Sequence, residues 1–166
     1  MQDPSIIKHI RDILILPFTV TVIIPWLIYD KHQALFNATI FLKVIGIILF
    51  VCGLILFLRT VYLFKTIGKG TLAPWTPTQK LVIAGPYRYC RNPMISGVFF
   101  ILLGETLLLN STNILIEALI FFAFNTIYFI LIEEPDLYKR FGEEYLVYKK
   151  NVPRWIPKLK AYKPQK

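Results

Sequence analysis

Long apolar stretches alternate with short polar ones along the chain, a pattern typical of an α-helical membrane protein. The apolar runs extend over Ile13–Tyr29, from about Ile40 to Phe64, from about Met94 to Leu109, and over Thr112–Ile132. A helix needs about 20 apolar residues to cross a bilayer. The first and third runs are short, so they require tilt or local thinning. We predict about four spans, the first kinked at its two prolines, Pro17 and Pro25.

Composition supports the same fold class. The 166 residues are 55% hydrophobic, with a mean hydropathy of +0.55. A soluble domain of this length has too little interior to bury so much apolar surface, whereas lipid solvates it directly. The first apolar run lacks a small-residue cleavage site, so we interpret it as a retained helix. The prediction is an all-α, polytopic transmembrane helical bundle.

Basic residues predict the orientation of the spans. The formal net charge is +9, and Lys and Arg gather before the first run, between the second and third, and after the fourth. The positive-inside rule then places both termini and the long middle loop in the cytoplasm. Because the charge flanks apolar runs, contact with anionic lipid headgroups explains it better than nucleic-acid binding.

Cysteine and histidine positions argue against two kinds of site. Cys52 lies in an apolar run and Cys90 in a basic loop, so we expect no disulfide between them. His9 and His32 fall on opposite sides of the first run, so we expect no shared metal site.

The cytoplasmic loop Gly70–Gly97 is the most informative segment. Gly85-Pro86 indicates a turn. Asn92-Pro93 favours a helix start, with Asn92 as its cap. Free amides at that helix end, with Arg88 and Arg91 beside them, suit a carboxylate or phosphate. The alternative is a basic anchor that only touches lipid headgroups.

Acidic residues close the fourth run, in the sequence Glu133-Glu134-Pro135-Asp136. Acids at the C-terminal end of a helix oppose its dipole, so we expect positive charge nearby, either an arginine or a cationic ligand. The alternative is a solvated helix end.

Apolar residues recur at helical spacing after Pro135, which predicts a C-terminal amphipathic interfacial helix lying on the membrane. That helix would cap a cofactor pocket or act as a simple anchor; its apolar residues are Leu137, Phe141, Tyr145 and Tyr148.

Small and acidic residues within the runs have structural interpretations. Gly46 and Gly53 share one helix face, as do Gly97 and Gly104, which allows close helix packing. The remaining acids of the apolar runs, Glu105 and Glu117, lie near the outer turn, and we assign them packing or interface roles.

Two stretches resemble signatures of integral-membrane methyltransferases, a group that includes isoprenylcysteine carboxyl methyltransferases and phospholipid N-methyltransferases. Gly85–Pro93 followed by Gly97 resembles the first signature. Glu133-Glu134, Phe141–Tyr145, Tyr148–Lys150 and Val152–Arg154 resemble the second.

The resemblance implies a cytoplasmic-face enzyme that uses S-adenosylmethionine to methylate a membrane-soluble or lipid-like acceptor. The resemblance covers roughly Gly70–Pro157. From the length and the apolar runs we predict one membrane domain over residues 1–166, with a helical hairpin over 1–69 and a cofactor-binding region over 70–166. Carried over by position, the cofactor contacts would include Gln79, Lys80, Leu81, Val82, Tyr87, Asn92, Pro93 and Glu133. From the charges beside them we expect Arg91 to join the cofactor-binding residues, and we expect Arg88 and Glu134 to be the catalytic residues.

Three positions depart from the pattern of the resembling family. Asn92 replaces the usual His and cannot carry charge near neutral pH. Ile95 replaces the usual Tyr. Phe129 stands where the isoprenylcysteine enzymes carry a substrate-binding Arg, so an amine or another lipid-soluble nucleophile gains weight over a prenylcysteine carboxylate. Two alternatives remain, an NADPH-dependent lipid or sterol reductase and a non-catalytic membrane protein with a decayed site.

Overall fold

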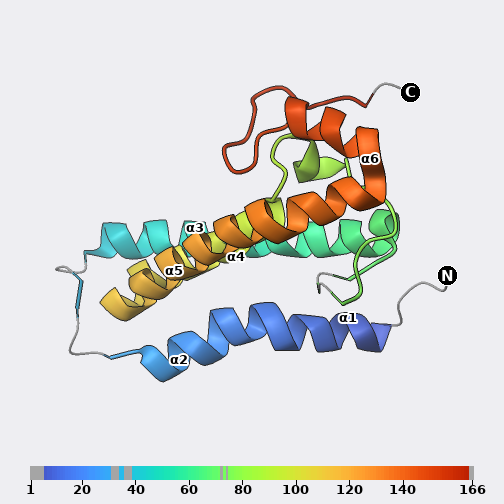
Figure 1. Cartoon of the computed structure of the whole chain (residues 1–166). Coiled ribbons are helices and arrows are strands. Elements are labelled where there is room, and N and C mark those ends of the chain that lie inside the picture. Colours follow the sequence, from blue (N-terminus) through green and yellow to red (C-terminus); the bar gives the residue numbers. More distant parts are fainter. Residues whose placement is uncertain (1–5, 31–33, 36–38, 72, 74, 165–166) are drawn as a thin grey trace.

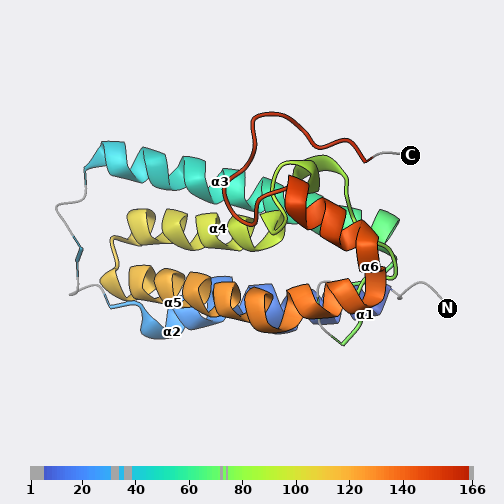
Figure 2. The same ribbon diagram turned by 45° about the horizontal axis from the view of Figure 1, so that its top comes forward.

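Helices dominate the part of the chain that the computed structural model describes, which is residues 6–30, 34–35, 39–71, 73 and 75–164. The long helices lie roughly side by side along one axis (Figure 1), and Figure 2 shows the same arrangement from a second direction. His32 lies outside the described residues, as does the side chain of His9. The expectation about a shared metal site is therefore untested.

The N-terminal helix is continuous but changes its winding. It begins as α1 (Ile6–Ile13), passes through the π-helix η1 (Leu14–Ile23) and ends as α2 (Ile24–Ile28). Pro17 lies inside η1, and a proline removes one helical hydrogen bond. At Pro17, the first of the two predicted kink positions, the helix therefore adopts the wider π-helical winding.

The second apolar run forms α3 (Ile40–Leu63), which continues as the π-helix η2 (Phe64–Gly68). Thr39 caps its start by accepting a hydrogen bond from the amide of Leu42 at 3.4 Å. The chain leaves η2 through Lys69, which has a positive φ of 52°.

The third and fourth runs form an antiparallel hairpin. They are α4 (Pro93–Leu109) and α5 (Thr112–Tyr128), joined by a turn in which Asn110 adopts φ 51°. Ser111 caps α5 through its hydroxyl, which accepts from the amide of Ile114 at 3.5 Å.

Helices α3 and α4 pack closely through their glycines, as predicted. A Cβ added to Gly53 would lie 2.6 Å from the carbonyl oxygen of Gly97. One added to Gly104 would lie 2.8 Å from the carbonyl oxygen of Gly46. A side chain at either position would therefore push the two backbones apart.

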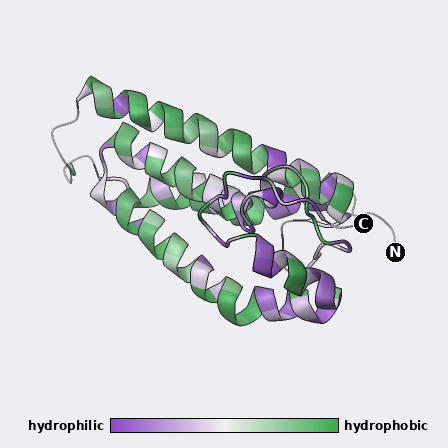
Figure 3. Ribbon diagram, turned by 90° about the horizontal axis from the view of Figure 1, so that it is seen from above, coloured by the Kyte–Doolittle hydropathy of each residue, from purple (hydrophilic) through white to green (hydrophobic). Residues whose placement is uncertain are grey.

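The apolar helices confirm an integral-membrane, polytopic fold. Within the described residues, three helices are long and apolar enough to cross a bilayer: Ile10–Ile28, Ile40–Gly68 and Thr112–Asn151. α4 is apolar but shorter, at 17 residues. Hydrophobic colouring follows the helices of the bundle, and hydrophilic residues concentrate at the end where α6 lies (Figure 3).

The last long helix differs from its predicted form. From α5 it continues through the π-helix η4 (Phe129–Glu133) into α6 (Glu134–Asn151), which breaks sharply at Gly142 with φ 55° and ψ −132°. Tyr145 and Tyr148 are buried inside the protein, against partly buried Leu81 and Ile83. The apolar face of α6 thus packs on the middle loop. Whether it also caps a cofactor pocket stays a prediction.

One end of the bundle gathers the start of α1, the end of η2, the start of α4 and α6 (Figures 1 and 2). Asp12 ties the N-terminal helix to the middle loop at this end. Its fully buried carboxylate accepts hydrogen bonds from the Thr71 hydroxyl, from Trp75 Nε1 at 3.1 Å and from Arg11 Nε at 2.8 Å.

Candidate functional site at the α4 entrance

The segment before α4 is shaped by its turn residues. Gly85 has φ 53°, which a glycine adopts without strain, and it opens the 3₁₀ turn η3 (Gly85–Arg88). Asn92 occupies the cap position of α4 and Pro93 its first turn, as predicted. The Asn92 side chain, however, makes no capping hydrogen bond with any described residue.

Glu134 meets the α4 entrance in a cluster of charges. Its Oε1 accepts hydrogen bonds from Arg91 Nη1 at 3.0 Å and Arg154 Nε at 2.7 Å, and its Oε2 lies 2.8 Å from Lys149 Nζ. Arg91 Nη1 also donates to the Tyr145 hydroxyl at 3.1 Å. Glu134 therefore meets the arginine-bearing entrance as predicted. The acidic pair does not end a helix, however, because the helix continues from α5 through both acids into α6.

The cations around Glu134 come from three segments of the chain. The sequence indicated Arg91 but gave no partner role to Lys149 or Arg154, although both belong to the C-terminal stretch that carries the resemblance. The backbone reinforces the contact, because the Arg91 amide donates to the Pro153 carbonyl at 2.9 Å and the Asn92 amide to the Arg154 carbonyl at 3.3 Å.

Several buried polar atoms near the α4 entrance have no hydrogen-bond partner among the described residues. They belong to the predicted cofactor residues and to one residue that the sequence did not indicate: Tyr87 Oη, Arg91 Nε, Asn92 Nδ2 and Trp155 Nε1. A buried donor without a partner is costly. All four groups can donate, so they are matched to a bound anion or to neutral acceptors.

Tyr87, in η3, is buried in the segment that precedes the α4 entrance. Its ring stacks on Phe64 with a centroid distance of 5.6 Å, and its carbonyl accepts from the Tyr148 hydroxyl at 2.7 Å. Burial raises the pKa of the Tyr87 phenol well above its usual value, with smaller contributions from Tyr148, Cys90 and Glu133. The phenol therefore stays a neutral donor at physiological pH.

Glu133 differs from its neighbour Glu134 in its surroundings. It is half-buried, and its Oε2 accepts a hydrogen bond from the Tyr128 hydroxyl at 3.4 Å. That bond is long, whereas Glu134 makes three short contacts with cations. Of the two acids, Glu133 is the better placed to receive a cationic ligand group.

The loop that carries Gln79–Val82 is held from several sides. The Gln79 amide donates to the Gly68 carbonyl at 2.7 Å, and Arg140 Nη1 donates to the Thr78 carbonyl at 2.8 Å. Val82 is buried against Leu63 and Tyr87, while the side chains of Gln79 and Lys80 are exposed.

Arg88 makes a different contact from the one expected beside the acids. Its Nε donates to the carbonyl of Tyr162 at 2.7 Å, and its own carbonyl accepts from the Tyr162 amide at 2.9 Å. Arg88 thus fastens the C-terminal tail. Its predicted catalytic role stays a prediction.

An aromatic group extends from the site along α5. Trp155 packs edge-on against Phe129 at 6.0 Å and lies 4.8 Å from Phe122, which in turn lies 4.9 Å from Phe99. Phe129 is therefore part of an aromatic cluster with Phe99, Phe122 and Trp155.

Two hollows lie away from the Glu134 cluster. One, of about 390 Å³, lies at the C-terminal tail. The other, of about 420 Å³, lies between the N-terminal helix and the C-terminal end of α4, where Glu105 lines it. Oxygens of Glu105 and Glu117 are buried without a hydrogen-bond partner among the described residues. Their predicted packing or interface roles stay predictions.

Comparison with known families assigns the central part of the chain. Residues 41–144, more than half of the chain, match the sequence model of the family described as phospholipid methyltransferase. This range extends from α3 into the second half of α6, so it includes the α4 entrance, Glu133 and Glu134.

Similar proteins of known name support the same assignment. The protein-S-isoprenylcysteine O-methyltransferases of Mus musculus and Rattus norvegicus are each 39% identical over 90 residues, or 52% of this chain. The match covers only 30% of each relative's own length. A solved structure described as the eukaryotic intramembrane Ras methyltransferase, isoprenylcysteine carboxyl methyltransferase, shares the fold. It has a TM-score of 0.57 and 21% identity, and the match covers 96% of this chain and 56% of that one.

Proposed function

The chain belongs to the phospholipid methyltransferase family of integral-membrane proteins, and from this premise we propose that it transfers a methyl group from S-adenosylmethionine to a lipid-like acceptor. The observation that carries the proposal is the contact between Arg91 and Glu134 at 3.0 Å. It joins the start of α4 to the acidic start of α6, beside buried polar atoms that lack partners among the described residues.

The residues at the entrance match the charges of this cofactor. Arg91 Nε and Asn92 Nδ2 are unpartnered donors among the described residues, and the first-turn amides of a helix favour an anion. These groups would hold the cofactor's carboxylate. Glu133 would hold its ammonium group. When bound, S-adenosylmethionine supplies an electrophilic methyl group on a sulfonium.

Residues around these contacts would position them. The three cations on Glu134 leave it little capacity for a ligand, so we assign it to holding Arg91 in place. Tyr87 remains protonated and offers a fixed donor. The buried side of the loop, where Leu81 packs on α6 and Val82 is buried, would shield the site from water and strengthen its electrostatic interactions.

The acceptor would reach the site from the bilayer past the aromatic cluster of Phe122, Phe129 and Trp155. Such a cluster gives no charge partner to a carboxylate, and burying an unpaired charge is costly. We therefore expect the acceptor to present an amine or another nucleophile without a carboxylate. The gathering of Lys and Arg at this end supports a reaction at the cytoplasmic face, with both termini cytoplasmic.

Calorimetric titration of the purified chain in nanodiscs tests the cofactor site. Wild-type protein should bind S-adenosylmethionine, and S-adenosylhomocysteine should compete. Glu133→Gln should weaken binding by about tenfold, as expected for the loss of one charge-assisted contact of about 1.5 kcal/mol. Glu144→Gln, an exposed acid on α6, is the matched control.

Other outcomes would contradict the proposal. Displacement of the ligand by NADPH, with no effect of S-adenosylhomocysteine, would favour the reductase alternative. Binding that is unchanged in Glu133→Gln would remove the site described here. For the acceptor, methyl-labelled cofactor should be incubated with membranes holding phosphatidylethanolamine or a prenylcysteine analogue, followed by lipid extraction. Label in the carboxylate-bearing analogue alone would refute the predicted acceptor class.

A further inference from the structure

The C-terminal tail is strapped onto the surface of the protein after α6. The Lys158 amide donates to the Tyr89 carbonyl at 3.0 Å, and Tyr162 exchanges two hydrogen bonds with Arg88. The Tyr162 ring also lies 6.3 Å from the ring of Tyr148 on α6. The backbone over residues 158–162 is therefore held in a fixed path, which fixes where its side chains begin.

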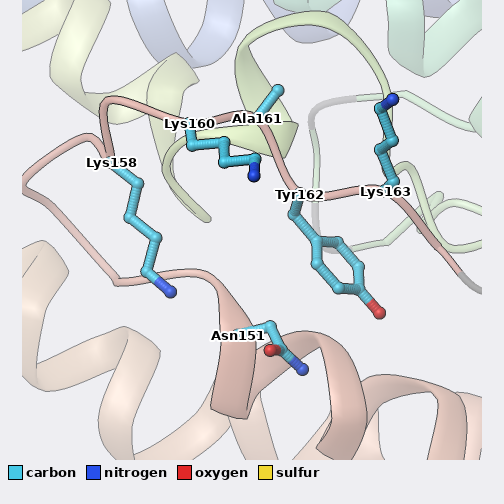
Figure 4. Close-up of a pocket in the computed structure, with 6 residues that line it drawn as sticks. All are labelled: Asn151, Lys158, Lys160, Ala161, Tyr162 and Lys163. Carbon is cyan, nitrogen blue, oxygen red and sulfur yellow. The ribbon is translucent and has the colours of Figure 1, made fainter.

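A hollow of about 390 Å³ lies between this strapped tail and the end of α6 (Figure 4). Figure 4 shows Lys158 and Tyr162 extending from the tail toward the α6 end where Asn151 lies, whereas Lys163 extends the other way. Half of the lining residues are lysines, and the full lining is Asn151, Lys158, Lys160, Ala161, Tyr162 and Lys163. The hollow is thus suited to an anion that also accepts hydrogen bonds from an amide and a phenol.

Apolar side chains project from the same tail. Ile156 is 81% exposed and Leu159 is 104% exposed, the latter between Lys158 and Lys160. Fully exposed aliphatic side chains are unfavourable in water but favourable among acyl chains. Lysines next to such residues keep their ammonium groups at the level of the headgroups. The tail therefore has the two-sided chemistry of a segment in contact with a bilayer surface.

We propose that the hollow between the C-terminal tail and α6 binds the phosphate headgroup of an anionic phospholipid, while Ile156 and Leu159 contact its acyl region. Lys158 and Lys160 supply the charge complementarity. The exposed aliphatic residues distinguish a lipid from a free phosphate, which would leave them in water. None of the residues that line the hollow is among the predicted cofactor or catalytic residues, and the test does not depend on catalysis.

Native mass spectrometry of the full chain in detergent tests the proposal. Short-chain phosphatidylglycerol, phosphatidylcholine with the same acyl chains, and inorganic phosphate are titrated separately. The double variant Lys158→Gln and Lys160→Gln should bind phosphatidylglycerol at least tenfold more weakly, since each lysine near anionic lipid contributes a factor of about five. The matched control is Lys65→Gln with Lys139→Gln, which removes the same charge from two exposed residues elsewhere.

Wild-type protein should prefer phosphatidylglycerol over phosphatidylcholine, and the control should change affinity less than about twofold. Leu159→Ser should weaken the lipid while leaving any phosphate binding unchanged. Equal losses in the two double variants would show diffuse attraction and overturn the site. Equal binding of both lipids, or phosphate binding as strong as that of phosphatidylglycerol, would overturn the identification of the ligand. Thermal unfolding of each variant checks that the fold is retained.

Discussion

Within the described residues, the Glu134 carboxylate pairs with three cations, Arg91, Lys149 and Arg154. Replacing Glu134 by Gln removes this shared negative charge. Gln keeps the size of the side chain and one carbonyl oxygen, so a hydrogen bond survives. The charge does not, and three cations are left side by side. We therefore expect Glu134→Gln to destabilise the packing of the tail and α6 on the start of α4.

Burial sets the magnitude of this effect. The Arg91 and Glu134 side chains are 10% and 5% exposed, and breaking a buried ion pair from one side costs about 3–5 kcal/mol. Lys149 and Arg154 are more exposed, so solvent screens their contributions. Taking about 3 kcal/mol, and a shift of about 2–4 °C per kcal/mol for a chain of this size, Tm should fall by about 6–12 °C.

Thermal unfolding in detergent, followed by circular dichroism, measures the change in Tm. The matched control is Asp136→Asn, because Asp136 pairs with Arg140 at 2.7 Å but is 48% exposed. An exposed pair contributes about 0–1 kcal/mol, so the control should lose no more than about 4 °C. If Glu134→Gln melts with the wild type or no lower than the control, the buried cluster is not what holds this end together.

Three further predictions concern packing, the N-terminal helix and a thiol. Gly53→Ala should lower Tm, because its Cβ would lie 2.6 Å from a backbone oxygen of α4 and overpacking costs about 1–3 kcal/mol. The control is Cys52→Ala, at an exposed position of the same helix. Equal Tm values for the two variants would contradict close packing of α3 and α4. Asp12→Asn should free the middle loop at a cost of about 1–3 kcal/mol, read as faster proteolysis there, and an unchanged cleavage rate would argue against the tie. In a Cys52→Ala background, Cys90 should react slowly with iodoacetamide at pH 8, because burial raises the pKa of its thiol and so lowers the thiolate fraction. The labelling rate should rise only at higher pH. Labelling at the rate of a free thiol would refute the burial of Cys90.

Much of the architecture could be predicted from local patterns. Apolar runs identified the helices because a bilayer requires about 20 apolar residues per span, whatever the surrounding fold. Gly46, Gly53, Gly97 and Gly104 predicted the α3–α4 contact because only small residues permit that approach. The sequence also indicated that acids ending the last run need positive neighbours, and Arg91 was correctly among the candidates.

Other features depend on where the chain turns. Regular spacing predicted α6 as one helix on the membrane, but a single residue with positive φ, Gly142, folds its second half back over the middle loop. Periodicity reports which side chains share a face and says nothing about what that face meets. Tyr145 and Tyr148 could therefore be placed on an apolar face from sequence, but their burial within the protein could not.

The sequence by itself determined that this is a helical membrane protein of the methyltransferase type, because spans, helix starts and signatures are properties of contiguous residues. Only the tertiary structure decided which charges pair. Glu134 takes Lys149 and Arg154 together with Arg91, Arg88 holds the tail, and Asp12 reaches the loop at Thr71. Electrostatic attraction depends on distance in space and on burial, and neither is fixed by separation along the chain.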